Sequence, residues 1–246
     1  MVYRISYLPS IAIYRFIVFS SLLLSFMSLP VLGEENNATQ TVSVQLTVEE
    51  QQWLDTHPQI IVGGELDWAP FDFVGSDGEY QGISKDVMDL IGDKTGLDLV
   101  YKTGQTWNEL VNSFSRNELS ILPAMYQTPE REAYTIFTKP YFSIYNYVFM
   151  RSDRKAHTDI NELTDYRIAV IDGYSIIGDM EKQLPGIEFL KVKSLQAGID
   201  AVLFKKADAY VDGYAVVAYQ LAMQMQTGIK PVMPLDLFTN SLPYWC

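Results

Sequence analysis

The most informative segment of the chain reads SILPAMYQTPEREAYTIFTKPYF, from Ser120 to Phe142. Its first residues, Ser120 to Leu122, form a short apolar run of the kind found in buried strands. Thr128 followed by Pro129 is a helix start, because threonine can cap a helix and proline has no N–H to leave unpaired there. The segment therefore predicts a strand, a loop and a helix in succession.

Arg131 falls in the first turn of this predicted helix. The helix dipole makes that end positive, so a cation there is unfavourable unless an anion meets it. One interpretation is that Glu130 and Glu132 neutralise the arginine on a wet surface. The other is a carboxylate-binding site, which we favour because the preceding loop, with Ala124 and Tyr126, lies where open α/β sheets bind ligands.

Composition and charge limit the class of protein. The chain has 246 residues, of which 48% are hydrophobic, enough for one large domain or two small lobes. Its net charge of −12 argues against binding nucleic acid through phosphates. The single cysteine, Cys246, excludes an intramolecular disulfide and a cysteine-rich metal site. His57 and His157 match no zinc-site or Ser-His-Asp pattern, so no metal, cofactor or catalytic residue is predicted.

Residues 1–33 have the pattern of an export signal. An apolar run from Phe16 to Met27 follows a positively charged start and ends before Pro30 and Gly33. This pattern is typical of a secretory signal cleaved near Gly33. The alternative is an uncleaved membrane anchor, since the run approaches the roughly 20 residues that span a bilayer. Both interpretations predict that the remainder of the chain is exported.

Residues 34–58 are predicted to form a polar tether and a short N-terminal helix. Thr47 and Glu50 have the spacing of a capping box at the start of that helix. The helix should carry Trp53 and Leu54 onto the body of the domain before His57 and Pro58 end it.

Apolar runs and helical patterns then alternate as β-α-β-α-β over residues 59–146, which predicts a first lobe with a mostly parallel sheet. The predicted elements are strands Ile60–Val62, Leu97–Tyr101 and Leu119–Leu122, and helices from Ile83 to Gly96 and from Trp107 to Phe114. Trp68 follows the first of these strands on an irregular loop. An aromatic residue in that place either covers a ligand or closes the core.

A second lobe is predicted over residues 147–232. The run Tyr141–Met150 is read as one long strand that could cross between the two bodies. After the strand Arg167–Ile171, Ser175 stands at a helix start. There its hydroxyl and the free N–H groups could hold an anion, or the serine could simply cap the helix.

Asp212 lies at the end of a further predicted strand, Ala207–Gly213. A buried carboxylate costs several kcal/mol unless a cation reaches it. The ammonium group of a ligand would meet this need. The alternative is that Asp212 caps the predicted helix from Tyr214 to Met225.

Together these residues resemble the family 3 bacterial extracellular solute-binding proteins, the Venus-flytrap binders of amino acids and similar polar solutes. Thr128–Arg131 and Phe137–Tyr141 carry the most specific part of the likeness, which covers roughly Leu46 to Leu221. The segment from Leu46 to Gly63 is similar, more narrowly, to the periplasmic sensor domains of virulence-type hybrid histidine kinases. The resemblance implies an α/β, two-lobed periplasmic-binding-protein-like fold of type 2, each lobe a mostly parallel sheet flanked by helices.

The resemblance also implies roles for particular residues. Arg131 corresponds to the arginine that grips the ligand carboxylate, and Asp212 to the acid that receives the α-ammonium. The other implied ligand-binding residues are the aromatic wall Trp68, the hydroxyl of Ser175, and the loop residues Ala124 and Tyr126. Pro123–Tyr126 stands where many amino-acid binders have a serine-rich loop, and Ile176 replaces a commonly polar position. These departures suggest a less polar, partly filled cleft.

The implied function is ligand binding by lobe closure, without chemistry and without a cofactor. The expected partners are a small amino acid or carboxylate and a membrane signalling domain that reads closure. The alternatives are the binding subunit of an amino-acid ABC transporter, acting with a permease, or a lyase or dehydratase on the same fold. Residues 233–246 look like the start of a return crossing to the first lobe, so the chain is expected to be cut from a longer protein.

Overall fold

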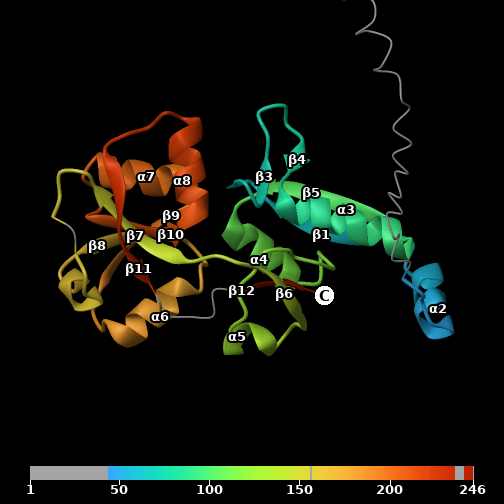
Figure 1. Cartoon of the computed structure of the whole chain (residues 1–246). Helices are drawn as coiled ribbons and strands as arrows, with labels where there is room; N and C mark the ends of the chain where they lie inside the picture. Colours follow the sequence, from blue (N-terminus) through green and yellow to red (C-terminus); the bar gives the residue numbers. More distant parts are fainter. Residues whose placement is uncertain (1–43, 156, 236–240, 246) are drawn as a thin grey trace, which may run out of the picture. The chain divides into compact units, whose positions relative to one another are not determined.

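The computed structural model describes residues 44–155, 157–235 and 241–245 (Figure 1). The predicted signal or anchor of residues 1–33 lies outside these described residues. None of the described helices is both long enough and apolar enough to span a bilayer. We call the elements from β1 to β6 lobe 1 and those from β7 to β11 lobe 2.

The first described element is helix α2 (Val48–Thr56), which starts with the predicted capping box between Thr47 and Glu50. The helix buries none of its residues, and Trp53 is 49% exposed. The expectation that it carries Trp53 onto the body is therefore wrong. The ring instead stacks on His57, at the C-terminal end of the same helix, with 4.1 Å between the ring centroids.

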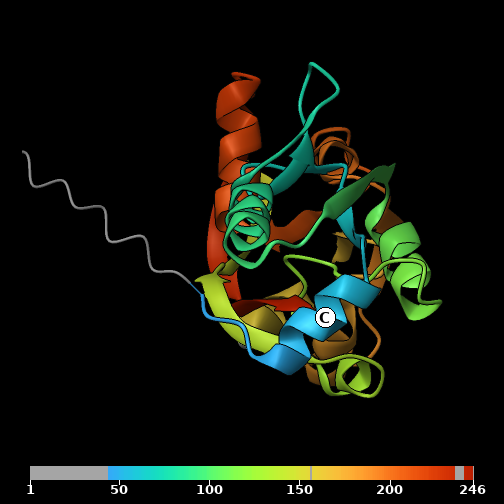
Figure 2. The same cartoon turned by 90° about the vertical axis from the view of Figure 1, so that its right-hand side faces the viewer.

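Lobe 1 is built on two parallel strands, β1 (Ile60–Glu65) and β5 (Leu99–Gln105). Helices α3 (Ile83–Thr95) and α4 (Trp107–Ser115) lie on opposite sides of this pair (Figure 2). Val62 packs in a cluster with Met88 of α3, whereas a Cβ added to the next residue, Gly63, would come within 3.2 Å of Leu110 of α4. The glycine therefore allows α4 to approach the sheet closely.

Two further features of lobe 1 bear on the site. A small antiparallel sheet follows β1, with strands β2 (Asp67–Trp68), β3 (Asp72–Val74) and β4 (Tyr80–Gln81). The predicted strand Leu119–Leu122 is wrong, since only Ile121 pairs, through an isolated parallel bridge to Val62.

The run predicted as one strand from Tyr141 to Met150 is two strands, β6 (Phe137–Ser143) and β7 (Asn146–Arg151). Strand β6 pairs with β12 (Ser241–Trp245), whereas β7 belongs to the sheet of lobe 2. At the break, the Tyr145 carbonyl accepts a hydrogen bond from Tyr214 N, 2.8 Å away, at the start of helix α8 (Tyr214–Met223). The segment thus passes from one sheet to another.

Lobe 2 contains a five-stranded sheet in the order β11-β7-β10-β8-β9. Strand β8 (Arg167–Ile171) pairs in parallel with β9 (Glu188–Val192) and β10 (Ala209–Gly213). Strand β7 pairs antiparallel with β10 and with β11 (Ile229–Leu235), an antiparallel edge that the sequence patterns did not predict.

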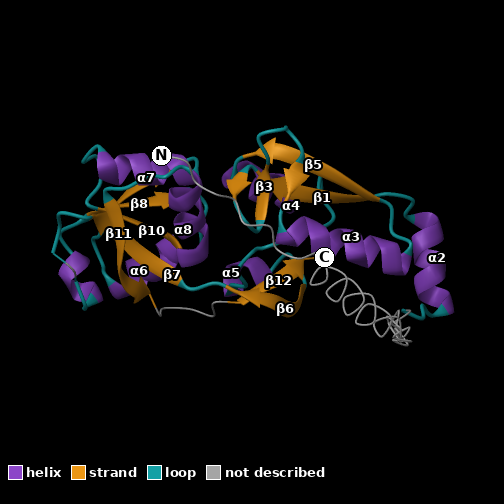
Figure 3. Ribbon diagram, turned by 45° about the horizontal axis from the view of Figure 1, so that its top comes forward, coloured by secondary structure: helices purple, strands orange, loops and turns teal. Residues whose placement is uncertain are grey.

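Lobe 2 also carries the helices α6 (Ile176–Gln183), α7 (Leu195–Leu203) and α8 (Tyr214–Met223) and a short 3₁₀ turn, η2 (Ile160–Leu163) (Figure 3). Along β7, Val148 and Met150 join one buried cluster and Phe149 joins another. Both faces of this sheet are therefore covered, and its open positions lie at the strand ends.

Candidate functional site

Arg131 lies in the single-turn helix α5 (Pro129–Glu132), which Thr128 caps as predicted. The arginine is only 7% exposed, so the interpretation of a wet-surface charge is wrong. Its Nη1 donates to the Tyr126 carbonyl at 2.8 Å, and its Nη2 donates to the Gly173 carbonyl of lobe 2 at 3.2 Å. The guanidinium also lies 5.6 Å from the centre of the Trp107 ring, and burial lowers the pKa of Arg131.

Asp212 lies in β10 and is 1% exposed. Its Oδ1 accepts from Gly213 N at 2.6 Å and from Trp68 Nε1 of lobe 1 at 3.4 Å, and its Oδ2 accepts from the Tyr210 hydroxyl. Helix α8 has Gly213 at its N-cap and no side-chain cap, so the alternative that Asp212 caps this helix is wrong. Burial raises the pKa of Asp212 to about 6, although its hydrogen bonds oppose the shift.

A deep cavity of about 20 Å³ lies beside Arg131. Five of the six predicted binding residues line it, namely Trp68, Ala124, Tyr126, Arg131 and Ser175. Glu65, Trp107 and Tyr174 complete the lining. The volume holds one or two water molecules, because one water needs about 10–15 Å³ by this measure. A larger cavity, of about 570 Å³, is also lined by Arg131, Tyr174 and Ser175, together with Gly173 of lobe 2, so there is open space next to the guanidinium.

Two of the predicted residues have unusual local structure. Ala124 is buried with a left-handed φ of 59°, which is uncommon for a residue other than glycine. Ser175 stands at the N-cap of α6, but its hydroxyl makes no capping hydrogen bond. The alternative of a simple capping serine is therefore wrong.

The two lobes are joined around the deep cavity by further hydrogen bonds. Trp107 Nε1 donates to the Gly173 carbonyl at 3.1 Å, and Asn108 Nδ2 donates to Asp172 Oδ2 at 2.7 Å. On the other side, Leu195 N donates to Asp67 Oδ2 at 2.8 Å. These bonds hold lobe 1 and lobe 2 together at the site.

Glu65 is the site residue that sequence reasoning missed most clearly. It ends β1, is buried, and lines the deep cavity. Burial, and then the negative charges of Asp72, Asp67 and Asp212, raise its pKa well above the usual value. Its place at the carboxyl end of a buried strand was the available signal. Trp107 offered no such signal, since its spacing is that of a core-facing helix residue.

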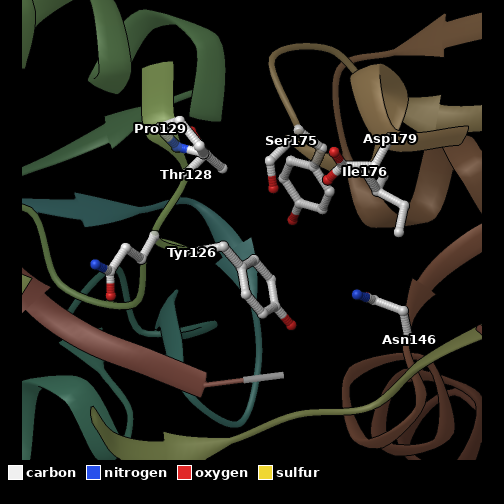
Figure 4. A pocket seen from close by; sticks show the side chains of 9 residues that line it. Tyr126, Thr128, Pro129, Asn146, Ser175, Ile176 and Asp179 are labelled. Atoms are coloured by element: carbon white, nitrogen blue, oxygen red, sulfur yellow. The ribbon is translucent and has the colours of Figure 1, made fainter. Parts of the chain in front are cut away.

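A second cavity, which we call the side chamber, lies next to the deep cavity and has a volume of about 150 Å³. It is lined by Tyr126, Gln127, Thr128, Pro129, Asn146, Tyr174, Ser175, Ile176 and Asp179. The Tyr126 hydroxyl and the Asn146 amide point toward one another across it (Figure 4). Among the described residues, no group of His, Cys, Asp and Glu side chains is placed to hold a metal ion.

Comparison with known proteins agrees with this geometry. The family model of bacterial extracellular solute-binding proteins, family 3, matches residues 60–228. The chain belongs to this family. Its described part has the two-lobed α/β fold of periplasmic binding proteins. The solved structures compared below have the same fold.

The relatives of this solute-binding chain are described as sensors. It is 25% identical over 191 residues to the virulence sensor protein BvgS of Bordetella pertussis, covering 78% of the chain and 15% of that protein. It is 24% identical over 181 residues to the sensor protein EvgS of Escherichia coli O157:H7, covering 73% of the chain and 15% of that protein. The chain therefore spans only a small part of the length of either relative.

Solved structures show the same fold. The B. pertussis BvgS periplasmic domain has a TM-score of 0.74 at 23% identity, covering 95% of this chain and 42% of that one. An ancestral arginine-binding protein bound to glutamine has a TM-score of 0.67 at 19% identity, covering 75% of this chain and 83% of that one.

Proposed function

We propose that this chain binds a small solute carrying both a carboxylate and an amine, an amino acid or a close relative, between its two lobes. The observation that carries the proposal is the pair of buried, opposite charges, Arg131 and Asp212, each bonded to a neutral group of the other lobe. A ligand carboxylate would replace the carbonyls at Arg131, and a ligand ammonium would replace the indole at Asp212. No chemical step is required of the chain.

The bound state would be read by another part of a signalling protein. This step is supported by the likeness to BvgS and EvgS, which are sensors and are much longer than this chain. A ligand can shift the balance between open and closed lobes only by binding one of them better. A ligand that contacts Arg131 of lobe 1 and Asp212 of lobe 2 at once would meet that condition, because only the closed state brings both residues to it. We propose a periplasmic location, with export directed by residues 1–33.

Isothermal titration calorimetry of the purified chain with the common L-amino acids tests the proposal. Arg131→Ala should weaken binding of the best ligand at least about 100-fold, because it leaves a desolvated carboxylate without its cation. Arg116→Ala is the matched control, since Arg116 is exposed and pairs only with its neighbour Glu118. Unchanged affinity in a folded Arg131→Ala protein would refute the assigned role.

A further inference from the structure

Helix α7 of lobe 2 is capped by residues of both lobes. The first N–H groups of a helix have no acceptor within the helix, so they need acceptors from elsewhere. Ser194 supplies one from its own lobe, since its hydroxyl accepts from Ala197 N at 3.2 Å. Leu195 N instead donates to the other lobe, where Oδ2 of Asp67 in strand β2 accepts at 2.8 Å. An acidic side chain of lobe 1 therefore completes the cap of a lobe 2 helix.

Asp67 also supplies a charge that α7 lacks. The first turn of α7 contains no acidic residue of its own. The helix dipole makes this end positive, so a negative group is stabilising there. Burial raises the pKa of Asp67, whereas hydrogen bonds from Leu195 N and Gln196 N oppose that shift because they favour the ionised carboxylate. The contact is therefore a charge-assisted hydrogen bond, which is stronger than one between neutral groups.

The contact between Asp67 and α7 lies outside the cavities beside Arg131. Neither Asp67 nor Leu195 lines the deep cavity, the side chamber or the larger cavity of about 570 Å³. The side chain of Leu195 is fully buried, in one apolar cluster with Trp68 and Phe71 of lobe 1. Because β2 and α7 belong to different lobes, the carboxylate meets Leu195 N only when the lobes are closed. The contact thus stabilises closure without touching a ligand.

The negative charge of Asp67 also has an opposing effect, because Asp212 of lobe 2 can carry the same charge. Asp67 contributes to the raised pKa of Asp212, but less than burial does, and less than the three hydrogen bonds that Asp212 accepts act to lower it. Asp67 bonds directly to α7, whereas it acts on Asp212 only through space. We therefore expect the attraction to α7 to outweigh the repulsion from Asp212.

We propose that Asp67 is a positioning residue for ligand binding. By capping α7 from the opposite lobe, it favours the closed state and slows the release of a solute that it does not touch. Its effect on release rests on the proposed function, but its effect on closure needs no ligand. A contact outside the ligand cavities would then help to set the balance between open and closed lobes.

Small-angle X-ray scattering of the ligand-free chain tests the effect on closure. Asp67→Ala removes both the acceptor and the charge, so the lobes should open more often and the radius of gyration should increase. Asp77→Ala is the matched control in lobe 1, because Asp77 is exposed and bonds only to Glu79 N and the Gln81 amide. Equal radii for the unmodified chain and both variants would overturn the role of Asp67.

Asp67→Asn guards against a folding defect in Asp67→Ala. The asparagine has a similar shape and can still accept from Leu195 N, but it has no charge. Its radius of gyration should lie between those of the unmodified chain and Asp67→Ala. Far-UV circular dichroism should show that both variants are folded. An Asp67→Asn protein that is folded and more closed than the unmodified chain would show that repulsion from Asp212 dominates, and would overturn the proposal.

Stopped-flow kinetics tests the effect on release, with the common L-amino acid that binds the unmodified chain most tightly. Asp67→Ala should raise the dissociation rate about tenfold and leave the association rate nearly unchanged, because the lost bond forms only in the closed state. Asp77→Ala should change neither rate. A residue that matters only for folding would lower the urea midpoint without a specific change in dissociation. An unchanged dissociation rate in folded Asp67→Ala would therefore contradict the positioning role.

The outcomes separate this role from the proposed function. If Arg131→Ala abolishes binding but Asp67→Ala changes neither the ligand-free radius nor the dissociation rate, the role of Asp67 is wrong and the proposed function stands. If no amino acid binds but Asp67→Ala still enlarges the ligand-free radius, the proposed function fails, and only the effect of Asp67 on closure stands.

Discussion

Two buried tryptophans of lobe 1 each donate an indole N–H to lobe 2, but they meet different groups. Trp68 Nε1 donates to the Asp212 carboxylate at 3.4 Å. Trp107 Nε1 donates at 3.1 Å to the Gly173 carbonyl, which also accepts from Arg131. The carboxylate can change its charge near neutral pH, whereas the carbonyl cannot. We call the surroundings of Asp212 the anionic half of the site and those of Arg131 the cationic half. The anionic half should therefore respond to protonation, and the cationic half should not.

The comparison also shows how both buried charges are satisfied. Arg131 is satisfied by two backbone carbonyls, and Asp212 by an indole, a hydroxyl and a backbone N–H. A bound amino acid would have to replace these neutral partners. Its affinity would depend on how much stronger the hydrogen bonds of Arg131 and Asp212 are to a charged partner than to a neutral one. A charge-assisted hydrogen bond is roughly twice as strong as a bond between neutral groups.

Asp212→Ala should have the largest effect on stability, because it removes the carboxylate at the centre of the anionic half. The change leaves the fully buried Tyr210 hydroxyl and the Trp68 indole without their acceptor. At about 1–3 kcal/mol for each of these two unsatisfied groups, we expect the free energy of unfolding in urea to fall by about 2–6 kcal/mol. Asp153→Ala is the control, because its side chain is 69% exposed and pairs only with Arg151. Equal urea midpoints for the two variants would contradict the arrangement around Asp212.

Stability should also depend on pH through the anionic half. Burial raises the pKa of Asp212 to about 6, from an ordinary value of 3.8. It also raises the pKa of Asp72, at the start of β3 in lobe 1, to about 7 from the same ordinary value. Such a carboxyl binds its proton more tightly in the folded state. Its contribution to stability is therefore complete below the unfolded pKa and is lost as the pH rises through the folded pKa.

The pKa of the neighbouring Glu65 is also raised, by burial and then by Asp72, so this residue acts in the same direction. We therefore expect the free energy of unfolding to fall by at least roughly 2–4 kcal/mol between pH 5 and pH 8. Carboxylates with lowered pKa values, such as Glu118 at about 2, titrate below this window and do not disturb it. Asp72→Asn should remove much of the slope, since the amide can still accept from Glu65 N. A stability that rises over this pH range would show that Asp72 and Asp212 are not the groups that titrate.

Local sequence rules predicted the elements that local interactions decide. The capping box at Thr47, the cap of α5 at Thr128 and the left-handed Gly96 after α3 are each fixed within one or two turns of chain. For the same reason Arg131 and Asp212 could be selected from the sequence. One is a cation in the first turn of a helix, and the other is an acid at the end of a buried strand.

What the sequence could not supply depends on contacts between distant segments. The strand predicted at Leu119–Leu122 is reduced to one parallel bridge between Ile121 and Val62, where Ser120 N and Ile121 N both donate to the Ile61 carbonyl. The side chamber brings Asn146 of β7 close to Asp179 of α6 and Tyr126 of lobe 1. These residues share no sequence pattern, because their meeting depends on side-chain directions and on how the two lobes are joined.

Replacing each tryptophan by phenylalanine gives the smallest expected effect. It compares how the stability lost in each half of the site depends on pH. Both Trp68→Phe and Trp107→Phe remove a buried indole N–H and similar volume, so much of their cost is shared. The Trp68 indole, however, lowers the pKa of Asp212 and so favours its ionised form. Trp68→Phe should therefore cost up to about 1 kcal/mol more at pH 8 than at pH 5 in urea unfolding, whereas Trp107→Phe should cost the same at both. If both variants show the same pH dependence, the titrating group is not Asp212, and the division into a protonation-sensitive and a fixed half is wrong.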